Sequence, residues 1–304
     1  MPLVTTKEML QKARREGYAV GAFNANNLES VKAVLETCDK LEAPVILQVS
    51  QGAIQYAGLH YASAMVKAGA EAVKIPVALH LDHGTSFEQN VQCLAAGFTS
   101  LMFDGSKLPL DENVATTALI TRVAHAAGIP VEAELGIIPK IEDGLSPQKV
   151  RDLMTKPEDA KEFHARAQCD SLAVAIGAVH GMKERGAELD LELLQRLMGA
   201  VDIPFVLHGA SGIPFDQVQK ACAMGVCKVN VATRISMALL EGTSERLAAK
   251  PGEKDFRKVF DLGMERIAAA IEEYVNLFGC AGRAYTAGWA PGPKGPEVTE
   301  ESPE

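Results

Sequence analysis

Eight apolar runs alternate with eight amphipathic segments along this 304-residue chain, and this alternation constrains its fold more than any other feature. The runs are rich in Val, Ile, Leu and Ala and do not alternate cleanly with polar residues, which is typical of parallel strands buried on both faces. We expect strands over residues 18–24, 44–50, 76–83, 100–106, 130–136, 171–181, 204–211 and 227–233. Eight strand-then-helix units in one chain of this length predict an α/β fold of the (β/α)8 barrel type, also called a TIM barrel.

The segments between the runs show the 3.6-residue period of helices with one buried face. We expect these helices over residues 6–16, 28–41, 58–74, 87–96, 111–127, 158–167, 191–201 and 215–224. Two extra C-terminal helices are expected at 235–249 and 255–278, the second as an arm that packs outside the barrel or on another subunit. Residues 137–156 are expected to be irregular. The Pro-, Gly- and Glu-rich residues 285–304 are expected to be disordered, which leaves one domain over 1–284.

Composition excludes several classes of function. The net charge of -9 argues against a nucleic-acid binder, because phosphate-backbone affinity comes mainly from clustered Lys and Arg. No apolar stretch approaches the roughly 20 residues of a membrane span, and the N-terminus lacks the apolar core of a signal peptide. The six cysteines are scattered without a CxxC pair and are expected to be free thiols. We therefore expect a cytoplasmic protein that binds neither nucleic acid nor membrane.

Polar residues close every expected strand, at the end where barrel enzymes carry their active sites. They are Asn24, Ser50, Asp82 with His83, Asp104, Glu134, His180, His208 with Ser211, and Asn230 with Thr233. Three of the strands run into a His-Gly pair, although the chain contains only seven histidines. That repetition is not explained by strands simply ending in polar turns.

The three strand-end histidines His83, His180 and His208 could form a three-nitrogen metal site of the open, catalytic kind that zinc occupies. Asp82 lies beside His83 in the sequence and supplies a carboxylate suited to general acid or base catalysis.

Three further residues near these strand ends are expected to support the metal site or the barrel interior rather than to act on substrate. Asp104 and Glu134 follow on the next two strands and could hold a second cation or orient the metal ligands. His80 precedes Asp82 by two residues, so it shares a strand face with it, and we expect a hydrogen-bonded interior histidine rather than a fourth ligand.

Strands seven and eight close in HGAS at 208–211 and NVAT at 230–233. Barrels commonly build a phosphate site here from backbone N–H groups and the N-terminus of a following helix. Ser211 and Thr233 add hydroxyl donors, and Asn230 adds an amide. A small-molecule sugar phosphate is the expected partner.

Taken together, the motifs resemble those of the class II, zinc-dependent ketose-bisphosphate aldolases of the fructose- and tagatose-bisphosphate group. The matching stretches are AFNANN at 22–27, HLDHG at 80–84, VEAELG at 131–136, AVAIG at 173–177 through His180-Gly181, LHGAS at 207–211 and KVNVAT at 228–233. They span nearly the whole chain up to Arg283. The resemblance implies reversible cleavage of a ketose (bis)phosphate, such as fructose or tagatose 1,6-bisphosphate, to dihydroxyacetone phosphate and an aldehyde.

The resemblance also implies residue roles. His83, His180 and His208 would hold a Zn2+ that stabilises an enediolate, and Asp82 would exchange a proton with the hydroxyl beside the broken carbon bond. Glu142, on a mobile loop after the fifth strand, would carry out the second proton transfer. The residues expected to bind substrate are Asn24, Ser50, Gly181, Gly209, Ala210, Ser211, Asn230, Val231, Ala232 and Thr233.

The resemblance to this family also implies further cations and an oligomer of identical subunits. Asp104 and Glu134 match positions used for a second divalent cation, and a monovalent cation, Na+ or K+, would lie near the phosphate. We expect a homodimer or homotetramer.

The chain departs from the family pattern in the loop after the fifth strand. The family usually has a Gly-Gly pair where this chain has IIPKI at 137–141, and Pro139 restricts a loop that is expected to move. At the end of the eighth strand, Ala232 resembles the tagatose type, because the fructose type usually has an aspartate there.

Another departure concerns the second phosphate of a bisphosphate substrate. Tagatose-type relatives carry Arg-x-Gly-Met in the C-terminal helix, whereas this chain has DLGM at 261–264. Asp261 would repel a phosphate dianion. Arg257, Lys258 or Arg266 could compensate from neighbouring turns.

Four alternatives remain open at this point. A Schiff-base aldolase needs a lysine at a strand end inside the barrel, and Lys228 lies two residues before Asn230, away from the expected mouth. A metal-dependent hydrolase typically needs an HxH pair on its first strand, where Asn24 stands. The third is a class II aldolase for ketose 1-phosphates without a distal phosphate, and the fourth is a non-catalytic metal-binding relative.

Overall fold

The computed structural model describes residues 3–284, and its centre is a single parallel sheet in the order β3-β2-β1-β8-β7-β6-β5-β4. The strands are β1 Val20–Asn24, β2 Val45–Ser50, β3 Val77–Asp82, β4 Leu101–Phe103, β5 Val131–Leu135, β6 Ser171–Val174, β7 Phe205–Leu207 and β8 Val226–Val231. All their residues except Ser50 are buried, as the unbroken apolar runs predict.

The two edge strands, β3 and β4, meet and close the sheet into a barrel. Isolated parallel bridges pair His80 with Ser100 and Gly84 with Phe103. Backbone hydrogen bonds support them, including one of 3.0 Å from Leu81 N to Ser100 O. The predicted (β/α)8 barrel is confirmed.

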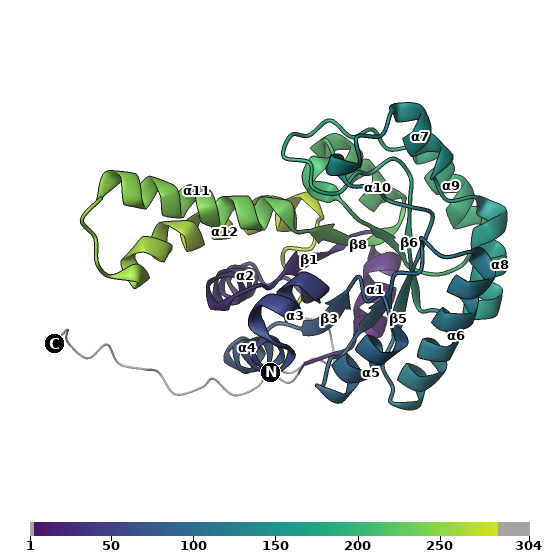
Figure 1. Cartoon of the computed structure of the whole chain (residues 1–304), viewed down its shortest axis with the longest axis horizontal. Helices are drawn as coiled ribbons and strands as arrows, with labels where there is room; N and C mark the ends of the chain where they lie inside the picture. Colours follow the sequence, from purple (N-terminus) through teal and green to yellow (C-terminus); the bar gives the residue numbers. More distant parts are fainter. Residues whose placement is uncertain (1–2, 285–304) are drawn as a thin grey trace.

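Helices surround the barrel in Figure 1. They are α1 Thr6–Glu16, α2 Leu28–Lys40, α3 Gln51–Ala57, α4 Leu59–Ala72, α5 Phe87–Ala95, α6 Leu110–Ala126, α7 Pro147–Asp152, α8 Pro157–Ala167, α9 Leu191–Ala200 and α10 Phe215–Met224, with 3-10 turns η1 Ile141–Asp143 and η2 Ala210–Gly212. The chain before and along α1 binds the amino ends of the strands, since Val4 N donates to Val77 O and Thr6 Oγ1 lies 2.9 Å from Ser100 Oγ. The opposite end, where the polar strand ends gather, is therefore left for a site.

The last two described helices, α11 Thr233–Ala249 and α12 Phe256–Leu277, form a hairpin arm that projects from the barrel (Figure 1). They approach closely where Gly242 faces Gly263. A Cβ at Gly242 would lie 2.5 Å from Leu262 O, so a side chain there would separate the helices. The predicted pair of extra C-terminal helices is confirmed.

Several predicted boundaries are wrong. The strands expected over 100–106, 171–181 and 204–211 end at Phe103, Val174 and Leu207. Gly177 and Gly209 have φ values of 111° and 70°, which an extended strand does not allow. The apolar residues beyond these points are buried as loop rather than as sheet.

Two short helices were not expected. Ser50 caps α3 through its side chain, and Ser146 caps α7, which also has Pro147 at its first position. The expected disordered tail over 285–304 lies outside the described residues. Among residues 3–284, no helix is both long and apolar enough to cross a membrane.

Candidate active site

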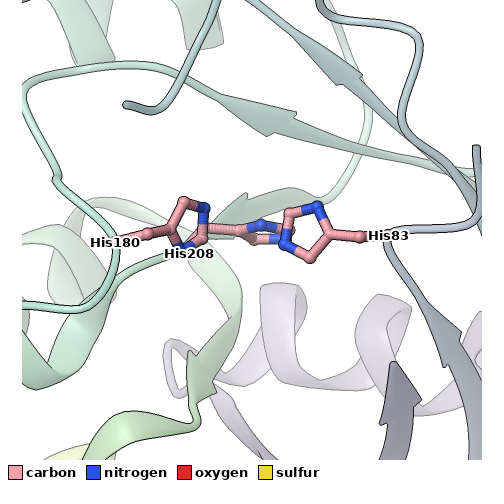
Figure 2. Close-up of side chains that lie close together, drawn as sticks. All are labelled: His83, His180 and His208. Atoms are coloured by element: carbon pink, nitrogen blue, oxygen red, sulfur yellow. The ribbon is translucent and has the colours of Figure 1, made fainter. Parts of the chain in front are cut away.

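The three histidines predicted to bind metal converge in space, although His83 and His180 lie nearly a hundred residues apart in the sequence. Figure 2 shows His83, His180 and His208 approaching one another from different segments. Their ring centroids are 4.8 to 5.9 Å apart. One ligand atom from each lies within 4.8 Å of the others. The spacing fits three nitrogens around one small cation.

An unusual backbone conformation brings His83 to this cluster. Neighbouring residues of a strand point to opposite faces, so His83 would point away from the cavity that Asp82 faces. Its φ of 51° lies in the left-handed region, which costs a non-glycine residue about 1–2 kcal/mol. The turn places both side chains on the same cavity. Strain of this kind is typical of functional sites.

Two amide side chains orient the carboxylate of Asp82. Asn24 Nδ2 donates to Oδ2 at 3.2 Å, and Asn230 Nδ2 donates to Oδ1 at 3.4 Å. Gln48 in turn donates to Asn24 Oδ1 at 2.7 Å. Asp82 Oδ1 lies 3.8 Å from His83 Nε2, so the carboxylate is beside the histidine cluster.

Asp104 and Glu134 lie on the other side of His83. Its Nδ1 is 2.9 Å from Asp104 Oδ2 and 3.6 Å from Glu134 Oε2. These three residues also form a group that could hold a cation. The structure therefore places both predicted carboxylates at the histidine cluster.

The electrostatics of this cluster are those of crowded ionisable groups. Burial would lower the pKa of His83, but the carboxylates of Asp82, Asp104 and Glu134 raise it to about 10. Burial, together with the charge of Asp104, raises the pKa of Glu134 to about 8. Burial and the neighbouring His83 lower the pKa of His180 to about 4. The carboxylates thus hold a positive charge on His83 while His180 stays neutral, and a cation bound among these residues would take over that positive charge.

Unpartnered polar atoms test whether a metal fits. His180 Nε2, His208 Nδ1 and Glu134 Oε2 are buried and have no hydrogen-bond partner among residues 3–284. His208 Nδ1 and Glu134 Oε2 lie 3.3 Å apart. A buried polar atom without a partner costs about 1–3 kcal/mol, so three at one point indicate a missing ligand. Imidazole nitrogens and carboxylate oxygens are zinc ligands, and the site fits that ion.

A cavity of about 720 Å³ opens above the cluster. The predicted site residues that line it are Asn24, Ser50, Asp82, His83, Asp104, Glu134, Glu142, His180, Gly181, Gly209, Ser211, Asn230, Ala232 and Thr233. Ala210 and Val231 are buried and are not among the lining residues. His208 is buried beneath the lining. The structure thus brings nearly all of the predicted residues together.

The loop after β5 is held against the cluster. His180 N donates to Pro139 O at 2.8 Å, and Ile141 N donates to His180 O at 2.9 Å. This pairing places Glu142 beside Gly181, where an added Cβ would lie 3.6 Å from Glu142 Oε1. The glutamate reaches the cavity from a loop that is pinned at two points.

The opposite wall of the cavity contains the N-terminus of α11. Ala232 is the N-cap of this helix, and its methyl side chain cannot accept a hydrogen bond. The first backbone N–H groups of α11 therefore have no capping side chain from the N-cap residue. Ser211 Oγ accepts from Arg234 N at 3.2 Å, which joins the loop after β7 to the start of the helix. Such a helix start is suited to an anion.

Sequence patterns assign no role in the site to two buried charged residues, Glu132 and Lys228. Lys228 Nζ lies 2.7 Å from Glu132 Oε2, and Glu132 Oε1 lies 3.1 Å from His208 Nε2. A signal was present: Glu132 precedes Glu134 by two residues and therefore shares its strand face. The interior histidine predicted at His80 is confirmed, because its Nδ1 lies 2.8 Å from Ser100 Oγ.

Comparison with known proteins agrees with this geometry. Residues 4–283 match the family model described as fructose-bisphosphate aldolase class-II. The fructose-bisphosphate aldolase of Geobacillus stearothermophilus is 41% identical over 287 residues, which cover 93% of this chain and 99% of that protein. The fructose-bisphosphate aldolase of Streptococcus pyogenes serotype M3 is 41% identical over 298 residues, covering 93% and 100%.

A solved structure shows the same fold. The YdjI aldolase from Escherichia coli K12 is 31% identical, has a TM-score of 0.82, and aligns over 93% of this chain and 100% of its own. Three findings point to the same family: the barrel with its three converging histidines, the family match over nearly all of the chain, and the relatives of matching length. The chain belongs to the class-II fructose-bisphosphate aldolase family.

Proposed function

We propose that this protein is a zinc-dependent lyase that reversibly cleaves a ketose (bis)phosphate, fructose 1,6-bisphosphate among them, to dihydroxyacetone phosphate and an aldehyde. The observation that carries the proposal is the convergence of His83, His180 and His208 beside the oriented carboxylate of Asp82, at the floor of a cavity of about 720 Å³. A bound Zn2+ would supply Lewis-acid stabilisation of negative charge on the substrate carbonyl oxygen.

Two carboxylates would move the protons. Asp82 would take the proton from the C4 hydroxyl in the cleavage direction, because Asn24 and Asn230 fix both of its oxygens beside the cluster. Glu142 would exchange the proton at the dihydroxyacetone-phosphate carbon, since it lies beside Gly181 on the cavity wall. Asp104 and Glu134 would orient His83 or share a second divalent cation.

The phosphate of the dihydroxyacetone half would lie at the start of α11. Gly181, Gly209 and Ser211 line one side of that region, and Asn230, Ala232 and Thr233 line the other. Backbone N–H groups and hydroxyls bind phosphate as local dipoles, so the net charge of -9 is no obstacle. A monovalent cation beside the phosphate belongs to the same proposal.

Substrate comparison tests the proposal. We expect turnover of ketose 1-phosphates as well as of fructose and tagatose 1,6-bisphosphate, with kcat/KM values within about tenfold, or roughly 1.4 kcal/mol, of each other. The reason is that Asp261 is exposed on α12 and does not line the cavity of its own chain. The basic neighbours are engaged elsewhere, Arg257 with Asp255 and Arg266 with Glu245.

Asp261→Arg is the matched variant for this comparison. Where a second copy brings its α12 to this cavity, the variant should raise kcat/KM for bisphosphates and leave kcat/KM for ketose 1-phosphates unchanged. A strong preference of the unaltered protein for either bisphosphate over every monophosphate would show that a distal phosphate clamp exists. Absence of turnover with all of these substrates would instead support a non-catalytic metal-binding relative.

We also propose a homodimer or homotetramer in which a second copy covers the arm. Leu240 and Leu247 on α11 and Phe256 on α12 are 65%, 45% and 68% exposed in the single chain. Apolar groups gathered on a projecting hairpin are typical of an interface. Light scattering should give two or four times the chain mass of 32.4 kDa. Leu240→Glu should lower that mass, and a monomer at micromolar concentration would contradict the proposal.

Cytoplasmic location is part of the same proposal. All six cysteines are buried free thiols, as expected for a protein in a reducing compartment.

A further inference from the structure

A layer of buried charge lies directly beneath the histidine cluster. Lys228, Glu132 and His80 are 0%, 2% and 0% exposed. Each precedes a cavity residue by two positions on its strand, so each points into the barrel. Barrel interiors are usually filled with branched apolar side chains. A buried ion pair is seldom more stabilising than apolar residues of the same volume, so stability does not account for this layer.

Hydrogen-bond donors and acceptors give this layer a defined direction. The ammonium of Lys228 only donates, and its Nζ lies 2.7 Å from Glu132 Oε2 and 3.2 Å from His80 Nε2. His80 Nε2 therefore accepts, which leaves the ring proton on Nδ1. That proton is donated to Ser100 Oγ at 2.8 Å, and Ser100 continues to Thr6 on α1 at 2.9 Å.

The other end of the layer contacts the cluster. Glu132 Oε1 lies 3.1 Å from His208 Nε2. A carboxylate held by an ammonium accepts hydrogen bonds, so Nε2 of His208 carries the ring proton and Nδ1 keeps its lone pair. Nδ1 lies on the cluster side, 3.3 Å from Glu134 Oε2, and has no hydrogen-bond partner among the described residues.

We propose that Glu132 and Lys228 are positioning residues that hold His208 in the Nε2-protonated tautomer and so present Nδ1 to the metal. Glu132 fixes the tautomer and the ring orientation. Lys228 occupies the second oxygen of Glu132, which keeps that carboxylate turned toward His208 rather than toward the cation. The inference rests on the proposed metal site and concerns how its affinity is set.

Zinc affinity, measured by competition with a chromophoric chelator, tests the proposal. Glu132→Gln and Lys228→Met should each weaken Zn2+ binding by about 10- to 100-fold, the usual effect of removing a partner of a histidine ligand. The double variant should lose little more zinc affinity than the single variant that binds zinc more weakly, because both substitutions act through one hydrogen-bond chain. Refilling the weakened site with excess Zn2+ should restore most of kcat.

Ser63→Ala is the matched control, since Ser63 is buried and donates to Ala96 O at 2.8 Å on the outer helices. It should lower the unfolding midpoint and leave zinc affinity unchanged. An affinity within about twofold of wild type in folded Glu132→Gln would overturn the inference, whereas the expected loss supports it. A wild-type protein that binds no zinc would overturn the proposed metal site itself. That outcome differs from one in which the wild type binds zinc and Glu132→Gln binds it equally well, which overturns only the positioning role.

Nitrogen-15 NMR of the imidazoles in the unaltered, metal-free protein gives an answer that needs no variant to fold. A proton on Nε2 of His208 is the expected result. A proton on Nδ1 would place the hydrogen at the atom assigned to the metal and would contradict the proposal.

Discussion

Asp82→Ala should slow carbon-bond cleavage by on the order of 100- to 10,000-fold while leaving bound zinc per subunit unchanged. The carboxylate is proposed to act on substrate, and its oxygens are held by Asn24 and Asn230 rather than committed to the cluster. Activity and metal content are measured on the same preparation. Loss of zinc together with activity would make Asp82 a metal ligand instead.

Two further variants separate basicity from position. Asp82→Asn keeps the size of the side chain and removes its basicity, so it should be nearly as slow as Asp82→Ala. Asn24→Ala keeps the carboxylate of Asp82 and removes one hydrogen-bond donor to it, so it should slow cleavage less than either Asp82 variant does. Asp152→Asn, an exposed aspartate on α7, should retain full activity.

Much of this site could be predicted from the sequence because parallel strands of a barrel all end at one edge. Once each apolar run is assigned to a strand, the polar residue closing it must lie at the same end of the barrel, whatever its distance along the chain. His83, His180 and His208 lie together for this reason. The same logic failed at the ends of β6 and β7, where left-handed glycines rather than strand residues carry the chain into the site.

Features that depend on exact backbone angles could not be predicted. Alternation alone directs His83 away from the cavity, and its φ of 51° reverses that direction. The contact between the loop after β5 and His180 depends on two backbone hydrogen bonds, which have no side-chain signature. Lys228 was correctly placed away from the mouth, but its role beneath the cluster depends on Glu132 and His80, which come from strands far away in sequence.

Prolonged chelation should lower activity by at least about 100-fold, and added Zn2+ should restore it. A metal that stabilises the developing charge by several kcal/mol accounts for such a loss, since each 1.4 kcal/mol corresponds to about tenfold in rate. His208→Ala should reproduce the loss without chelator. His125→Ala is the matched control, because His125 lies on α6 with Asp170 as its partner and should retain both metal and activity.

Borohydride added with substrate distinguishes metal catalysis from an imine. The enzyme should stay active, because Lys228, inside the barrel, is fully buried, bonds Glu132 and does not line the cavity. The lysines that do line the cavity, Lys107 and Lys140, are exposed on loops rather than on strands inside the barrel. Inactivation by borohydride, with substrate carbon attached to a lysine, would replace the metal mechanism by a Schiff base. If chelation then left the rate unchanged, the unpartnered atoms of His180, His208 and Glu134 would need another explanation.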